Sequence, residues 1–118
     1  MEQKFEVELL EDAFRFLEAM EPKPREKILQ NIRRAQIYHK PRMFKQLAEE
    51  IWEFRTSFAG VHYKFLIFWD KTESPDTLVI ASSGFIRKIR KVDKKEVSKA
   101  EQIREIYFKE KAHETILH

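Results

Sequence analysis

Two neighbouring apolar runs, rich in aromatic residues, constrain the fold of this chain more than any other feature. Residues 51–58 (IWEFRTSF) alternate between apolar and polar side chains, which is typical of a strand with one buried face. Residues 61–69 (VHYKFLIFW) are almost continuously apolar, which is typical of a more completely buried strand. Ala59 and Gly60 are a turn signal between them, so the sequence predicts a β-hairpin.

The register of this hairpin depends on the length of its loop. A loop formed by residues 57–60 places Glu53 opposite Lys64 and Arg55 opposite His62, an arrangement of compatible charges. A two-residue loop instead places Arg55 opposite Lys64, where two like charges repel each other. We therefore predict the four-residue loop.

The N-terminal part of the chain predicts one strand and two helices. Residues 4–10 (KFEVELL) alternate with the period of a half-buried strand. From Asp12 the apolar residues recur at helical spacing, and the prolines of the segment EPKP end this short helix. A second helix starts near Pro24 or Arg25 and carries one apolar stripe until the Lys-Pro pair at 40–41 stops it.

The C-terminal part predicts a further strand and a long final helix. Residues 77–83 (TLVIASS) follow a polar loop and form the strand. Asp93 followed by Glu96 is a capping signature, so the final helix begins there. Its apolar stripe consists of Val97, Ala100, Ile103 and Tyr107.

The predicted order is strand, helix, helix, three strands, helix, which indicates a small α+β fold. We expect residues 1–118 to form a single domain with a mostly antiparallel four-stranded sheet packed against the helices. A chain of 118 residues with 42% hydrophobic content is long enough to bury one core without covalent staples.

The absence of cysteine excludes a disulfide framework, a thiolate zinc site and a cysteine nucleophile. It fits a reducing compartment, and we expect a cytoplasmic protein. The longest apolar stretch, residues 65–69, is too short to cross a bilayer, and the N-terminus lacks the pattern of a signal peptide, so we expect no membrane contact. His113 and His118 lack ligand spacing, so we expect neither a metal nor another cofactor.

Positive charge is concentrated in two blocks of the sequence. Residues 23–45 hold eight basic residues and one acidic residue, and residues 84–118 hold ten basic and six acidic residues. The two blocks form either one positive surface or two unrelated solvated faces. Six cations of the second block fall within residues 87–95, directly after a strand. That position fits either a solvated helix start or a site for phosphate.

Three motifs in this order resemble those of a known toxin superfamily. WEFR, HYKFLIFW and SGFIRKIRKVDKKEVSKAEQIREIY are similar to two strands and the start of the last helix in the RelE/ParE toxins. The nearest branch is the HigB-like, phage Gp49-like toxins of type II toxin–antitoxin systems. The resemblance covers about residues 44 to 109. Lys64 stands where that branch usually has arginine, and Val92-Asp93 replaces a frequent Thr-Pro.

The resemblance implies a RelE-like fold and an endoribonuclease that cuts messenger RNA in the ribosomal decoding site, which inhibits translation. It also implies a partner antitoxin, usually a small helix-turn-helix protein, which blocks the toxin and through which alone the toxin meets DNA. By motif position, Arg55, Arg87 and Lys88 are expected on the concave face of the sheet where RNA lies, with Lys91 and Phe85 beside them.

Cleavage by attack of a 2′-OH on the adjacent phosphate needs a proton acceptor, stabilisation of the charged phosphorane and a proton donor. Arg55 and Arg87 are expected to hold the phosphate by planar hydrogen bonds. Lys88 or Lys91 is expected to accept the proton, because neighbouring cations lower the pKa of a lysine. Phe85 is expected to stack on a base. The remaining expected RNA contacts are His62, Lys64, Arg90 and Lys94.

Each of these assignments has an alternative. Arg55 is otherwise a surface ion-pair partner, and His62 a structural residue. Residues 23–45 are either a second contact with ribosomal RNA or an ordinary basic helix. For the whole chain, the alternatives are a toxin that poisons DNA gyrase as the ParE branch does, an inactive protein that only holds an antitoxin, and an RNA-binding module without chemistry.

Overall fold

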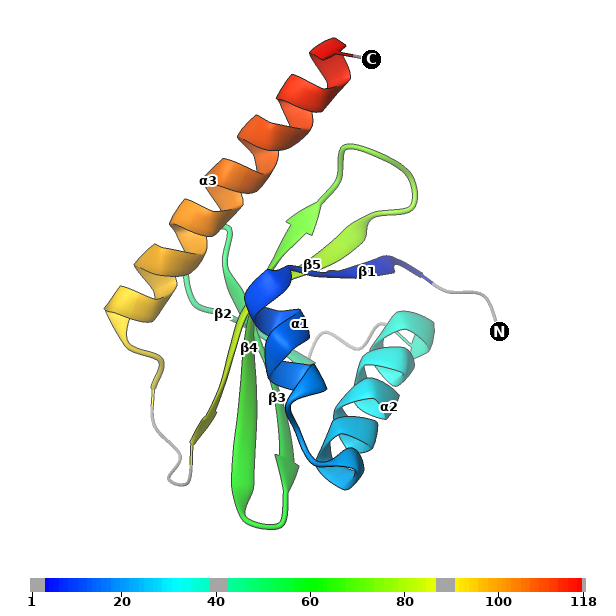
Figure 1. Cartoon of the computed structure of the whole chain (residues 1–118), viewed down its shortest axis with the longest axis vertical. Helices are drawn as coiled ribbons and strands as arrows, with labels where there is room; N and C mark the ends of the chain where they lie inside the picture. The colour runs from blue at the N-terminus through cyan, green and yellow to red at the C-terminus, as the bar shows by residue number, and fades with distance from the viewer. Residues whose placement is uncertain (1–3, 39–42, 87–90, 118) are drawn as a thin grey trace.

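The computed structural model describes residues 4–38, 43–86 and 91–117 (Figure 1). Within these ranges three helices lie against one five-stranded sheet. In chain order the elements are β1 (Glu6–Leu9), α1 (Glu11–Glu18), α2 (Pro22–Tyr38), β2 (Phe44–Gln46), β3 (Trp52–Phe58), β4 (Val61–Asp70), β5 (Thr77–Ile86) and α3 (Lys94–Leu117).

The strands are arranged in the order β1-β5-β4-β3-β2. Among the described strands β1 runs parallel to β5, and the other pairings are antiparallel. The predicted α+β class with a mostly antiparallel sheet is therefore confirmed. The sheet has one strand more than predicted, because the short β2 joins the edge of β3. Three residues are too few to show a strand period, so only their pairing with β3, from Phe44 opposite Phe54 to Gln46 opposite Trp52, reveals β2.

The β3–β4 hairpin has a two-residue loop, so the predicted four-residue loop is wrong. The strands pair up to either side of Ala59 and Gly60, which adopt positive φ angles of 49° and 78°. Two positive φ angles give a turn whose twist matches that of the flanking strands, which favours it over a longer loop. The resulting register places Arg55 opposite Lys64. This is the arrangement that we predicted against because the two like charges repel each other.

Each face of the sheet carries its own apolar cluster. On one face, the α1–α2 face, the apolar residues of α1 and α2 pack against Phe65 and Ile67 of β4. On the other, the α3 face, Ala100 and its neighbours on α3 pack against Leu66 and Phe68. Because side chains alternate along a strand, the even-numbered residues of β4 point to the α3 face.

A β-bulge in β5 determines which way the end of that strand faces. The pairing register shifts between Leu66 and Ile67, which leaves Ala81 as an extra residue of β5. A bulge of one residue reverses the alternation of the side chains that follow it. Before the bulge Val79 points to the α3 face, whereas after it the even-numbered Gly84 does.

The helix starts follow local signals in the sequence. α2 begins at Pro22, earlier than the predicted start near Pro24 or Arg25. The first turn of a helix tolerates proline, because the N–H that proline lacks would have no partner there. α3 begins with the predicted capping box. Lys95 N–H donates to Asp93 Oδ1 at 2.8 Å, and Asp93 N–H donates to Glu96 Oε2 at 3.2 Å. The predicted apolar stripe of this helix is also confirmed, because it packs on the α3 face.

Candidate functional site

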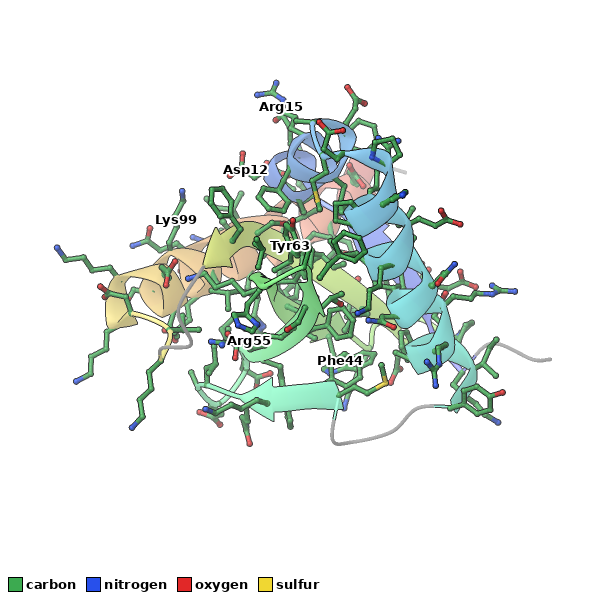
Figure 2. All side chains as sticks on the ribbon, turned by 90° about the horizontal axis from the view of Figure 1, so that it is seen from below. Asp12, Arg15, Phe44, Arg55, Tyr63 and Lys99 are labelled. Atoms are coloured by element: carbon green, nitrogen blue, oxygen red, sulfur yellow. The ribbon has the colours of Figure 1, made fainter. Side chains whose placement is uncertain are left out.

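Three of the predicted site residues lie together on the α3 face of the β3–β4 hairpin. Arg55 of β3 lies opposite Lys64, and His62 lies opposite Ser57. Partners across an antiparallel pair point to the same face, so these four side chains occupy adjacent positions. Figure 2 shows Arg55 and Tyr63 on opposite sides of the hairpin, with Tyr63 toward α1.

Arg55 is held by a carboxylate of its own strand. Its Nε lies 3.0 Å from Glu53 Oε2, and the Glu53 side chain is 5% exposed while that of Arg55 is 26% exposed. The contact is an ion pair and does not have the geometry of a hydrogen bond, so it holds the guanidinium near Glu53 without fixing its plane. The ion-pair role anticipated for Arg55 as an alternative is therefore present, and the guanidinium still reaches the surface.

Lys64 is a buried cation that reaches α3. Its side chain is 7% exposed, and Nζ donates to Glu96 Oε1 at 2.5 Å, in the first turn of the helix. The aliphatic part of the side chain passes over Gly84, where an added Cβ would lie 3.3 Å from Lys64 Cε. Lys64 therefore joins β4 to the start of α3, and the glycine opposite leaves it room.

His62 is partly buried on the same face as these cations. Its Nδ1 lies 2.6 Å from Ser57 Oγ, across the β3–β4 pair. This hydrogen bond orients the imidazole ring, and the tautomer decides which atom donates. The structure thus places His62 on the same face as Arg55. The sequence alone allowed either a structural role or an RNA contact for this residue.

Phe85 lies on the opposite face from Arg55. It pairs with Tyr63, whose ring contacts that of Phe16 on α1 at a centroid distance of 6.5 Å. The side chain of Phe85 is 59% exposed. Without the bulge in β5 it would point to the α3 face, so the bulge separates Phe85 from the other predicted site residues.

The rest of the predicted site belongs to the basic segment between β5 and α3. Three of the predicted residues lie outside the described part of the chain: Arg87, Lys88 and Arg90. β5 ends at Ile86, which pairs with His62. After the segment, Lys91 and Lys94 are both exposed, and Lys94 is the first residue of α3.

A comparison with protein families gives a match over most of the chain. The phage-derived Gp49-like protein family (DUF891) matches residues 15–105, from within α1 to the middle of α3. The chain belongs to the Gp49-like family. Members of this family are associated with the toxins of toxin–antitoxin pairs. Neither the curated proteins nor the solved structures gave a match.

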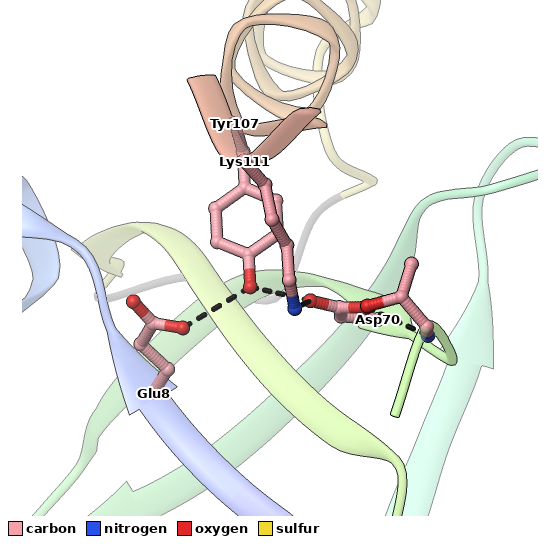
Figure 3. Close-up of polar contacts among 5 residues, drawn as sticks. Glu8, Asp70, Tyr107 and Lys111 are labelled. Atoms are coloured by element: carbon pink, nitrogen blue, oxygen red, sulfur yellow. Dashed lines mark hydrogen bonds and ion pairs between the residues drawn. The ribbon is translucent and has the colours of Figure 1, made fainter. Parts of the chain in front are cut away.

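A second polar cluster of this Gp49-like protein was not predicted from the sequence. Asp70, at the end of β4, is 2% exposed and lies at the centre of the cluster (Figure 3). It accepts hydrogen bonds from Tyr107 OH at 2.6 Å, from Lys111 Nζ at 2.5 Å, and from the backbone N–H and hydroxyl of Thr72. Tyr107 OH also lies 3.2 Å from Glu8 Oε2.

These contacts shift the pKa values of the cluster. Burial raises the pKa of Asp70, but the hydrogen bonds from Lys111, Thr72 and Tyr107 outweigh it and hold that pKa well below its usual range. Burial and the hydrogen bond to Asp70 raise the pKa of Tyr107. The same carboxylate raises the pKa of Lys111, against the effect of burial. At neutral pH the cluster is an ionised Asp70–Lys111 pair with a neutral tyrosine.

The sequence gives only a weak signal for this cluster. Tyr107 and Lys111 are four residues apart, so they share one face of a helix, and Asp70 ends an apolar run. Glu8, Tyr107 and Lys111 lie outside the range that matches the Gp49-like family, whereas Asp70 lies inside it. The cluster ties the end of β4 to β1 and α3. Six residues of strand, about 20 Å, separate Asp70 from Lys64.

An open groove of about 860 Å³ lies at the Asp70 end of β4, away from Arg55. Aromatic residues of β2, β3, β4 and α3 line it, among them both tryptophans of the chain, Trp52 and Trp69.

Among residues 4–38, 43–86 and 91–117, no group of three or more histidines and carboxylates is placed to hold a metal ion. Within the same ranges, no helix combines the length and the apolar character needed to cross a membrane.

Proposed function

We propose that this Gp49-like protein is a HigB-like toxin of a toxin–antitoxin pair that cuts messenger RNA on the ribosome. Membership of the family supports the toxin assignment. One observation carries the nuclease assignment: Arg55 and His62 share one face of the sheet, next to the strand end from which the basic segment 87–90 continues. Groups that bind phosphate and groups that transfer protons then meet at one place.

The RNA backbone lies across the α3 face of the hairpin in this proposal. The 2′-oxygen attacks the adjacent phosphorus, the P–O2′ bond forms and the P–O5′ bond breaks. Arg55, held near Glu53 by their ion pair, binds an oxygen of the phosphorane, and Arg87 supplies a second guanidinium. These cations stabilise the negative charge that develops in the transition state.

Two proton transfers accompany the displacement. Lys88 or Lys91 accepts the proton of the 2′-OH. His62 protonates the leaving 5′-oxygen, because histidine is the commonest general acid in enzymes and the bond to Ser57 orients its ring. Much of the rate of such a site comes from positioning, so the ribosome is needed to align the RNA. The antitoxin, a helix-turn-helix protein, blocks this activity in the cytoplasm.

Expression of the chain in bacterial cells tests the proposal. The wild type is expected to stop growth and to leave cleaved transcripts, while the double variant Arg55→Ala/Lys88→Ala leaves both growth and transcripts intact. Circular dichroism must show that the variant is folded. Arg15→Ala is the matched control, because Arg15 is an exposed arginine of α1 whose ion pair is with Glu11 of its own helix. Full toxicity of the double variant contradicts the site assignment.

A specific observation favours a second candidate function, the same fold without nuclease activity. Arg55 and Lys64 each already have a carboxylate partner, which compensates their charge. A gyrase-poisoning toxin of the ParE kind then damages plasmid supercoiling while messenger RNA stays intact. A protein that only binds RNA leaves RNA uncut and loses affinity steeply with salt. A protein that only holds an antitoxin has neither effect.

A further inference from the structure

We propose that Lys64 is a positioning residue, not an RNA contact: its ion pair with Glu96 anchors the start of α3 on the sheet beside Arg55. The effect on cleavage rests on the proposed function, whereas the anchoring itself does not.

The burial of Lys64 separates it from the other lysines near the site. A lysine that binds RNA is expected to be exposed, as Lys91 and Lys94 are. The side chain of Lys64 is 7% exposed, and its ammonium group is already bonded to Glu96 at 2.5 Å. Buried ion pairs add little net stability, because desolvation offsets the attraction, but they can fix how two elements sit against each other.

The contacts of α3 with the sheet create the need for such an anchor. Val97, Ala100 and Ile103 pack on the α3 face through apolar contacts, which have no direction and allow a helix to slide. Polar contacts define its position. Two sets of them come from β4, while Tyr107 also approaches Glu8 of β1 and Arg104 pairs with Glu50. Lys64 bonds near the start of the helix, and Asp70 bonds to its middle (Figure 3).

The spacing of the two attachments fits a helix that runs alongside β4. Lys64 and Asp70 are six residues apart on the strand, about 20 Å. Their partners Glu96 and Lys111 are fifteen residues apart on α3, about 22 Å. The contacts of Arg104, Tyr107 and Lys111 hold the middle of the helix, and the bond of Lys64 to Glu96 holds its start.

Glu96 links the anchor to the chain that enters the helix. Its Oε1 accepts from Lys64, while its Oε2 accepts from the N–H of Asp93 in the capping box. One carboxylate therefore fixes both the ammonium group and the residue before α3. Gly84 completes the arrangement, because a side chain there would come within 3.3 Å of Lys64 Cε.

Lys64→Met is the decisive variant, because methionine keeps most of the length of the lysine side chain while removing its charge, and no residue of α3 is substituted. It also leaves no buried charge without a partner, since the side chain of Glu96 is 37% exposed. Lys64→Arg keeps the charge and serves as the rescue variant. Lys99→Met, at an exposed lysine of α3, is the matched control.

Hydrogen exchange of the amides of Glu96 and Val97, both bonded to Asp93 O, reports the anchor directly. Lys64→Met is expected to speed their exchange about tenfold while the β3–β4 hairpin keeps its protection. Lys64→Arg and Lys99→Met are expected to match the wild type. Unchanged exchange in Lys64→Met overturns the proposal.

Measurements of cleavage and of RNA binding test whether the anchoring of α3 by Lys64 affects the proposed RNA site. Lys64→Met is expected to lower cleavage on ribosomes at least about tenfold, as misplacement of site groups does, and Lys64→Arg to restore it. The slope of RNA affinity against salt should not change, because no phosphate contact is lost; a slope smaller by about one identifies Lys64 as an RNA contact and refutes the proposal. Unchanged cleavage despite faster exchange also refutes it. If the wild type cuts no RNA, the proposed function is refuted instead. Hydrogen exchange of Glu96 and Val97 alone then tests whether Lys64 anchors α3.

Discussion

Arg55 lies directly opposite Lys64 in the β3–β4 pair, although both side chains are cations on the same face. Each of them turns to a different carboxylate: Arg55 to Glu53 of its own strand and Lys64 to Glu96 of α3. The like-charge contact is therefore compensated on both sides, and the two-residue turn can set the register. The two residues also have different roles in the proposals: Arg55 reaches the surface, where it can bind RNA, while Lys64 is buried and holds α3.

The turn itself gives the first prediction. Ala59 holds a φ of 49°, which is unfavourable for any residue with a Cβ but tolerated best by asparagine. Ala59→Asn is therefore expected to raise the free energy of unfolding by about 0.5 to 1 kcal/mol, measured by urea denaturation.

Gly60→Ala is the matched opposite change. The φ of Gly60 is 78°, and no atom lies within 4 Å of an added Cβ, so any loss comes from the backbone alone. Stability is expected to fall by about 1 kcal/mol. If both variants changed stability in the same direction, the two-residue turn would be refuted.

Lys111 and Lys109 make a matched pair for the polar cluster. Lys111 bonds to the buried Asp70, whereas Lys109 pairs with the exposed Glu105 of its own helix. Lys111→Met is expected to cost about 3 kcal/mol of unfolding free energy, because it leaves a buried carboxylate without its cation. Lys109→Met is expected to cost less than about 0.5 kcal/mol. Equal losses in thermal denaturation contradict a structural role for the cluster.

Acid should remove the contribution of the ionised Asp70 to the stability of the folded protein. Its pKa is lower in the folded protein than in the unfolded chain, where an aspartate titrates near about 3.9. The stabilisation is therefore complete above about pH 5 and is lost as the pH falls toward the folded-state pKa. The stability difference between the wild type and Asp70→Asn is expected to shrink between pH 7 and pH 3. A constant difference across this range means that Asp70 has no depressed pKa.

A substitution of Phe85 tests the proposal that RNA binds on the α3 face of the sheet and not on the α1–α2 face. Its side chain is exposed on the α1–α2 face, so Phe85→Ala is expected to leave cleavage within about twofold of the wild type and to change stability by less than about 0.5 kcal/mol. Arg55→Ala, on the other face, is expected to abolish cleavage. A loss of cleavage in Phe85→Ala with the fold intact places RNA on both faces of the sheet.

Local patterns in the sequence predicted most of the fold. The alternation of residues 51–58, the apolar run that follows and the Asp93–Glu96 capping box gave the hairpin and the start of α3. β2 was missed because three residues carry no period. The register was wrong because pairwise charge repulsion was weighed without Glu96, which comes from a distant helix.

The candidate site was less predictable than the fold. A single extra residue, Ala81, turns Phe85 away from Arg55, and nothing in the run TLVIASSGF marks a bulge. The burial of Lys64 depends on the glycine opposite it and on the placement of α3, both tertiary properties. Asp70 was missed for the same reason, since its partners on α3 lie 37 and 41 residues along the chain.

The most direct test of the proposed function is cleavage of a defined messenger RNA by the purified chain, with and without translating ribosomes. Primer extension locates the new 5′ ends. The account predicts cuts within the ribosome-bound stretch, few or none in free RNA, and none with Arg55→Ala/Lys88→Ala. Intact messenger RNA on ribosomes, from a folded wild-type protein that still stops growth in cells, would contradict it.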